Sequence, residues 1–330
     1  MPRLRQSEAM RRRPVPKPKT QAQSKRLPVN YDDPDHSECV AVSQHIAELM
    51  IADEWLEIAD EIANWEAELA SSPGGTRYHD IAVKTCLSGL QGLIEDAPRE
   101  ALSGLDQAQI EVMHFVDTHR QMPDNHVLAL LAARAHIAIG EACAADDWPG
   151  KERRAAWRKT AHHFIAAGKI LEPFDAMALM SPLLAEAQYL QANGSPSGED
   201  QLDQLFNMWI ELDPTNSDIY SLHVAALVAH DRVSGDEILR EADRALQRTE
   251  DTLGFGGYAL FFTPLLNEYD SARDLLDVEL YASALMDLAA NADNQTEVNH
   301  AAATLLAEVE AADADQADGL QDAMMLMVRQ

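Results

Sequence analysis

Two Glu-x-x-His pairs are the residues of this chain whose types and spacing could hold a metal ion. Glu111 and His114 form one pair, and Glu297 and His300 form the other. At positions i and i+3 of a helix, a carboxylate and an imidazole share one face, and ferritin-like proteins present such pairs to a di-iron site. That site also needs inward glutamates from two further helices around one core, and here about nine predicted helices separate the pairs. We therefore expect no metal or cofactor, and a di-metal helical enzyme using these four residues is an alternative.

A basic stripe follows the segment 151–171. At about 100° per residue, its members fall within about 40° of one another, with Arg154 beside them; they are Lys151, Arg158, His162 and Lys169. The stripe could pair with carboxylates of neighbouring helices, or it could bind an anion or an acidic peptide. The expected apolar face of the same helix consists of Trp157, Ala161, Phe164, Ile165, Gly168 and Leu171.

Aromatic residues gather around a Gly-x-Gly-Gly group in DTLGFGGYALFFTPLLNEY, residues 251–269. A phosphate-binding loop does not fit, because no strand precedes the glycines and no Gly-Lys-Ser/Thr follows them. The glycines indicate a tight turn between two helices, with the aromatic side chains in the core. The alternative is an aromatic-lined peptide pocket that involves Phe255, Tyr258 and Phe262.

Catalytic signatures are missing from the sequence. It has no Gly-x-Ser-x-Gly elbow, no kinase or P-loop set and no His-Glu-x-x-His motif. The three cysteines, Cys39, Cys86 and Cys143, are far apart and form no CxxC pair, so they predict neither a disulfide framework nor a zinc knuckle. We predict a protein that is not an enzyme and that resides in a reducing, cytoplasmic compartment.

The charge of the chain is unevenly distributed. Its formal net charge is −29, yet residues 1–26 contain nine Lys or Arg and one Glu. The acidic remainder should repel nucleic acid and anionic lipid, so we expect a basic protein or peptide partner and no nucleic acid on the body. The basic tail could contact a polyanion, which gives a regulatory protein as a further alternative.

A membrane span is not expected. The most apolar stretch, residues 126–145, is interrupted by Arg134, His136 and Glu141, whereas a span needs about 18 uninterrupted apolar residues. The N-terminus has arginine pairs but no apolar region of a signal peptide.

The periodicity predicts an all-α protein. Residues 1–34 are rich in proline and charge and are expected to be a disordered basic tail, and residues 35–330 form one helical domain with a possible sub-boundary at 193–199. Start signals include Ser234 with Glu237, Ser271 with Asp274 and Asn294 with Glu297. About fourteen helices are predicted, near 36–51, 53–70, 77–95, 106–120, 125–145, 151–171, 174–192, 199–212, 217–231, 235–250, 256–267, 271–290, 295–311 and 317–328.

The helices of residues 199–250 differ in how much of their surface is apolar. The segments 199–212 and 235–250 have one apolar face, whereas 217–231 is apolar nearly all round and must be sandwiched. This alternation favours stacked antiparallel helix pairs, an α-solenoid, over a four-helix bundle.

The junction WIELDPTNSDIY, residues 209–220, separates two of these helices. It resembles the end of a tetratricopeptide repeat, whose second helix closes with a Leu-Asp-Pro turn, and Phe206 and Tyr220 agree with aromatic sites of that family. The resemblance covers residues 170–250, and echoes at Pro123, Pro173 and Pro214 are 50 and 41 residues apart, compared with the 34 of the family. It implies a concave surface that binds a peptide or a protein. The sequence thus predicts a non-catalytic scaffold or adaptor, of undetermined oligomeric state.

Overall fold

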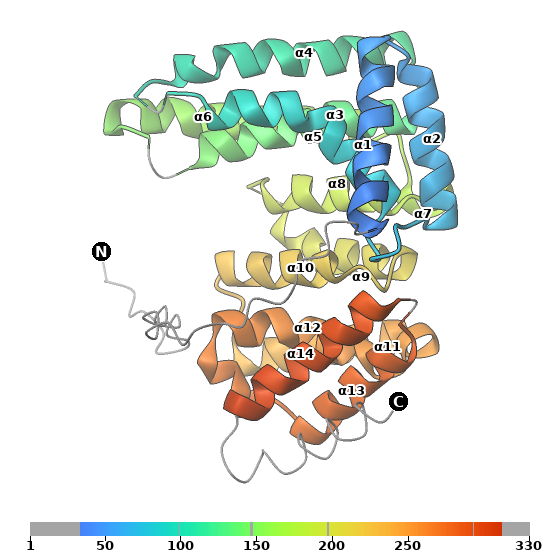
Figure 1. Cartoon of the computed structure of the whole chain (residues 1–330). Coiled ribbons are helices and arrows are strands. Elements are labelled where there is room, and N and C mark those ends of the chain that lie inside the picture. The colour runs from blue at the N-terminus through green and yellow to red at the C-terminus, as the bar shows by residue number, and fades with distance from the viewer. Residues whose placement is uncertain (1–33, 99, 146–147, 197, 293, 312–330) are drawn as a thin grey trace, which may run out of the picture. The chain divides into compact units, whose positions relative to one another are not determined.

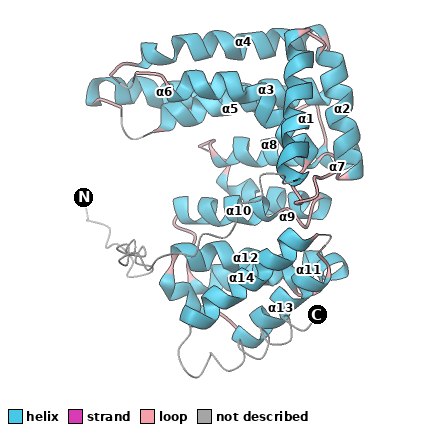
Figure 2. Cartoon of the chain, viewed as in Figure 1, coloured by secondary structure: helices cyan, strands magenta, loops and turns pink. Residues whose placement is uncertain are grey.

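The computed structural model describes residues 34–311 except 99, 146–147, 197 and 293. Within these residues the structure is helical throughout, with fourteen α-helices and three short 3-10 helices (Figure 2), and Ser71 and Arg77 form one isolated β-bridge. The all-α prediction is confirmed. The predicted tail 1–34 lies almost wholly outside the described residues, and the predicted helix 317–328 lies entirely outside them. The number fourteen is nevertheless reached because the predicted segment 174–192 is two helices.

The chain divides into two compact units at Asp213 and Pro214. We refer to residues 34–213 as the N-terminal unit and to the described residues from 214 on as the C-terminal unit. Sequence analysis expected one helical domain with a possible sub-boundary at 193–199. The structure places residues 194–198 in a loop inside the N-terminal unit.

The N-terminal unit is organised around one apolar helix, α5, which packs against α2, α3, α4, α6 and α8 (Figure 1). Among the described residues, α5 alone has the length and apolar composition of a membrane span, and 78% of that stretch is buried inside the protein. The helices of this unit are α1 (Pro34–Ile51), α2 (Trp55–Glu68), α3 (Tyr78–Glu95), α4 (Asp106–Gln121), α5 (His126–Ala144), α6 (Gly150–Leu171), α7 (Ala176–Leu179), α8 (Pro182–Asn193) and α9 (Leu202–Leu212), with 3-10 turns at Leu102–Leu105 and Glu199–Gln201.

The C-terminal unit packs α12 against α10, α11 and α13, and α14 against α13. A close approach between α11 and α12 explains one glycine, because a Cβ at Gly257 would lie 2.1 Å from Thr249 Oγ1. The glycines therefore allow the tight turn that the sequence predicts. The helices of this unit are α10 (Ser217–Ala229), α11 (Gly235–Leu253), α12 (Gly256–Glu268), α13 (Val278–Ala290) and α14 (Gln295–Ala311), with a 3-10 turn at Asp270–Leu275.

Local signals set several helix starts. The Ser234 side chain accepts a hydrogen bond from the Glu237 amide, and Asn294 Oδ1 accepts one from the Glu297 amide at 3.0 Å. Both predicted caps are confirmed. Ser271 instead lies in the 3-10 turn Asp270–Leu275, because α13 begins only at Val278, capped by the Asp277 side chain.

The packing of the N-terminal unit around α5 differs from that of an open solenoid. In a solenoid, each helix pair contacts only its neighbours along the chain, whereas α5 contacts both α2 and α8. The predicted array of stacked pairs thus stays a prediction.

Candidate functional site

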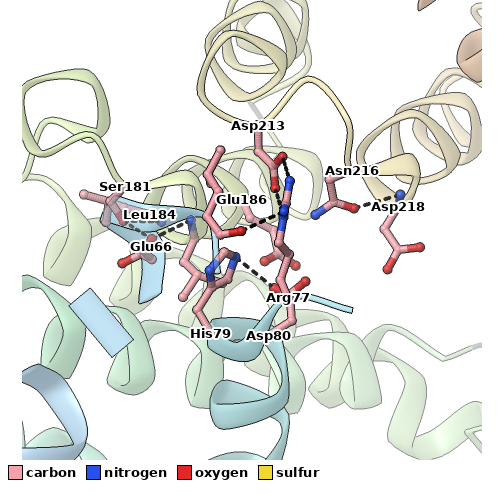
Figure 3. A network of polar contacts seen from close by, with 12 residues as sticks. Glu66, Arg77, His79, Asp80, Ser181, Leu184, Glu186, Asp213, Asn216 and Asp218 are labelled. Carbon is pink, nitrogen blue, oxygen red and sulfur yellow. Dashed lines mark hydrogen bonds and ion pairs between the residues drawn. The ribbon is translucent and has the colours of Figure 1, made fainter. Parts of the chain in front are cut away.

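A buried ion pair ties the two ends of the N-terminal unit together. Arg77, just before α3, donates from Nε to Asp213 Oδ2 at 3.1 Å and from Nη2 to Oδ1 at 2.6 Å (Figure 3). Its Nη1 donates to the Leu69 carbonyl at 2.8 Å, and Asp213 is fully buried. Two parallel charge-assisted bonds fix both position and orientation. The aspartate of the Leu-Asp-Pro junction is therefore a structural anchor.

A second buried acid, Glu66 of α2, lies at the start of α8. Its Oε1 accepts hydrogen bonds from Ser181 Oγ at 2.6 Å and from the Leu183 amide at 3.0 Å, while Ser181 Oγ accepts from the Leu184 amide and so caps α8. Burial raises the pKa of Glu66 to about 7, and the bonds from Ser181 and Leu183 lower it in part. Glu66 thus extends the cap of α8.

The same residues do not form a hydrolytic triad. A serine nucleophile needs an imidazole that accepts its proton, but here the carboxylate of Glu66 receives the Ser181 hydroxyl. His126 Nε2 lies 4.0 Å from Glu66 Oε2, too far for a hydrogen bond. Ser181 is 1% and Glu66 3% exposed, so neither can meet a substrate in this structure.

The other charged groups of this region also bind one another. Arg134 of α5 lies 2.5 Å from Glu186 of α8. Burial lowers the pKa of His79 to about 4, so its imidazole is neutral at physiological pH. Because these contacts join α2, α3, α5, α8 and α9, the network in Figure 3 serves the cohesion of the unit.

Two buried histidines meet where α6 packs on α5. His136 and His163 lie with their Nδ1 atoms 2.9 Å apart. One ring must donate and the other must accept, which requires at least one neutral imidazole. Burial lowers the pKa of His136 to about 4 and that of His163 to about 3, so both are neutral at physiological pH. The neighbouring His162 points to the opposite, exposed side of α6.

The two Glu-x-x-His pairs belong to different units. Glu111 and His114 lie on α4, and Glu297 and His300 lie on α14. The His114 ring meets Trp55 edge-on with centroids 5.6 Å apart. In the part of the chain that the structure describes, no group of three or more His, Cys, Asp or Glu could hold a metal ion. The geometry gives the di-metal alternative no support.

The predicted aromatic pocket is wrong for two of its three residues. Tyr258 is 3% exposed, Phe262 is fully buried, and their rings stack with centroids 4.6 Å apart. The Tyr258 hydroxyl accepts a hydrogen bond from the Asp277 amide at 3.1 Å, which fixes it inside the C-terminal unit. Both residues are core because α11 and α13 cover α12. Phe255, at 42% exposure, is the one member of the set on the surface.

An open depression of about 500 Å³ lies on α11. Its lining comes from one helix alone and mixes both charges: Asp236, Leu239, Arg240, Asp243, Arg244 and Gln247. This is an exposed helix face, and its walls do not enclose a substrate.

The basic stripe lies on the exposed side of α6, as predicted. Its residues Lys151, Arg158, His162 and Lys169 are all exposed. Among the described residues, none forms an ion pair with Lys151, Arg154, Arg158 or Lys169. Pairing with adjacent helices, the first interpretation of the stripe, therefore does not account for these cations.

The expected apolar face of α6 is wrong for Trp157 and Ile165. Trp157 is 75% and Ile165 is 53% exposed. The helix turns a different side to its neighbours α5 and α8: Ala156, His163, Phe164, Ala167 and Leu171. The reason is close packing, because Phe164 lies where a Cβ at Gly140 of α5 would come within 2.8 Å.

Apolar and cationic side chains consequently share one surface, which we call the α6 outer face. It comprises Lys151, Arg154, Trp157, Arg158, His162, Ile165 and Lys169. From Lys151 to Lys169 it extends about 27 Å at 1.5 Å per residue. Residues 34–213 contain eleven Lys or Arg and thirty Asp or Glu, and α6 has six of the former and one of the latter. The face is a cationic strip on an acidic unit.

Comparison with protein-family models, curated proteins and solved structures found no match to this chain. The resemblance to tetratricopeptide repeats therefore stays a prediction from the junction at residues 209–220.

Sequence reasoning found the cations of the α6 outer face but missed its apolar anchors. A signal was present, since Ala156, His163 and Ala167 form a second arc of small or apolar residues on the same helix. Choosing between the two arcs required the neighbouring helix, because both have helical spacing.

Proposed function

We propose that this protein is a non-catalytic scaffold or adaptor that binds a protein or peptide partner through the α6 outer face. The observation that carries the proposal is Trp157, a tryptophan that is 75% exposed among cations without ion-pair partners in the described structure. A large exposed apolar side chain in a polar surround is typical of interaction sites, and tryptophan and arginine are the residues most enriched in binding hot spots.

The anchors are large enough to matter energetically. Covering roughly 150 Å² of tryptophan surface is worth about 4 kcal/mol at 25 cal/mol/Å². Part of that gain offsets the loss of free motion on association. Ile165 adds a second anchor two helical turns along the same face. The cations around them supply the sign of the partner and speed encounter.

The charge of this face favours an acidic, apolar segment. The expectation of a basic partner came from the acidic body as a whole, but a basic segment laid along α6 would be repelled. A polyanion or an anionic membrane is a poor fit, because the remainder of the N-terminal unit carries 29 acidic and five basic residues and would repel an extended anionic surface. A short segment can lie on α6 alone.

Three free cysteines, two of them buried, agree with the reducing, cytoplasmic location that belongs to this proposal. A concave groove formed by stacked helix pairs also belongs to it.

Site-specific cross-linking tests the proposal. A photoreactive phenylalanine analogue is placed at position 157 of the full chain in the cells that make it, and at position 255 in a matched control, since Phe255 is an exposed aromatic residue of the other unit. We expect a discrete adduct from position 157 only, joined to an acidic, apolar segment, and a lower yield when Arg158→Glu and Lys151→Glu reverse the charge. Equal adducts from both positions, or none from position 157, would refute it.

A further inference from the structure

The segment after α14 has the chemistry that the α6 outer face would recognise. Residues 312–330, outside the described residues, read ADADQADGLQDAMMLMVRQ. They contain four aspartates and one arginine, and then a run of methionine, leucine and valine. Acid and apolar side chains thus occur together within 19 residues, whereas α6 presents cations and exposed apolar side chains together.

We propose that this C-terminal segment binds the α6 outer face, an inference that rests on the proposed function of that face as a binding surface. Its charge complements the face: the segment has four aspartates, and the face has four cations without an ion-pair partner in the described structure. Its methionines complement Trp157, because a thioether adapts to irregular surfaces and contacts aromatic rings favourably.

The spacing within the segment supports this fit. Asp315, Asp318 and Asp322 fall at i, i+3 and i+7, on one side of the predicted helix. Leu320, Met324 and Met327 fall at i, i+4 and i+7, on the other side. Twelve residues, 317–328, would extend about 18 Å as a helix, within the roughly 27 Å of the face. An amphipathic helix laid along α6 could place its acids beside the cations and its apolar side on Trp157 and Ile165.

The consequence is self-competition at the binding surface. A segment of the same chain, or of a second copy, occupies the face until a partner of similar chemistry displaces it. The partner must then bind better than the segment does at its effective concentration, which raises the affinity needed for capture.

The experiment uses the full chain with the photoreactive residue at position 157, purified and alone in solution. We expect mass spectrometry to find position 157 joined to residues 312–328, and the same residue at position 255 to give no such product. Replacing Asp315, Asp318 and Asp322 by asparagine should lower the yield at least tenfold. Joining within one chain or between two supports the proposal equally, and dilution tells them apart.

A labelled peptide of residues 312–330 gives a second measurement. By fluorescence anisotropy it should bind the full chain, and at least tenfold more weakly when Trp157→Ala is present or when its aspartates are replaced by asparagine. Phe255→Ala and Arg240→Ala are matched controls at exposed positions and should leave binding unchanged.

Two outcomes separate this inference from the proposed function. If the purified chain gives no adduct with residues 312–328 while the adduct with a cellular partner persists, the inference falls and the proposed function stands. If position 157 yields neither adduct, both fall. An adduct between position 157 and the helical body of a second copy would also overturn the inference.

Discussion

Replacing Glu66 by glutamine should remove a pH dependence of folding that this one buried acid creates. Glutamine keeps an acceptor oxygen for Ser181 Oγ and the Leu183 amide, the two donors that contact Glu66 Oε1. It removes the proton that the carboxyl group exchanges. The change therefore preserves the cap of α8 and isolates the titration.

The magnitude follows from the pKa of Glu66, which burial raises from 4.5 to about 7. Because each pKa unit corresponds to 1.36 kcal/mol, this difference is worth about 3 kcal/mol. The folded state holds the proton more tightly than the unfolded state. The contribution of Glu66 to the free energy of unfolding is therefore fully present below pH 4.5 and is lost as the pH rises through about 7.

Urea unfolding followed by circular dichroism, at half-unit steps from pH 4.5 to 8, measures this effect. The stability of Glu66→Gln relative to the wild type should rise by about 3 kcal/mol across that range. Buried histidines such as His163, whose pKa is lowered, lose stability as the pH falls below 6.5, and this opposite trend cancels in the difference between the two proteins. Glu68→Gln, an exposed glutamate of the same helix, is the control. A difference that stays constant with pH would refute the argument.

Three further predictions concern packing and reactivity. Asp213→Asn should lower the free energy of unfolding by about 3–5 kcal/mol, because it leaves the Arg77 guanidinium without its buried counter-charge; a loss below 1 kcal/mol in urea unfolding would contradict this. Gly194→Ala should cost about 1–3 kcal/mol, since the new Cβ would lie 2.0 Å from the ring of Phe164, and an unchanged melting temperature would show that the ring moves freely. The Cys86 thiol, 2% exposed and with a pKa that burial raises to about 12, should react with a disulfide reagent only in denaturant, and rapid labelling in the native state would exclude the packing described.

The helices could be predicted from the sequence because their signals are local. Apolar spacing along 202–212 and the caps at Ser234 and Asn294 depend on residues within a turn or two of one another. The same signals cannot show where a chain divides into units. The division falls at Asp213 and Pro214, since it depends on which helices contact each other, and the glycine-rich loop at 194–198 stays inside the N-terminal unit.

The candidate site divides in the same way. The cations of α6 were predictable, because charged side chains reach water from almost any helix. The exposure of Trp157 was not, since the helix has two arcs that could be buried, and the close contact between Phe164 and α5 selects the other one. For Tyr258 and Phe262 the decision was the reverse: their spacing suited a pocket as well as a core, and the cover of α11 and α13 made them core.

The sequence by itself determined the helical class, most helix boundaries and the cationic stripe of α6, because each depends on neighbours along the chain. The tertiary structure alone decided that Asp213 anchors Arg77, that Glu66 caps a helix more than a hundred residues away, and that Trp157 faces solvent. These outcomes depend on which surfaces meet when helices pack. Local spacing leaves several faces of each helix equally suited to burial, and only the fit of neighbouring side chains chooses among them.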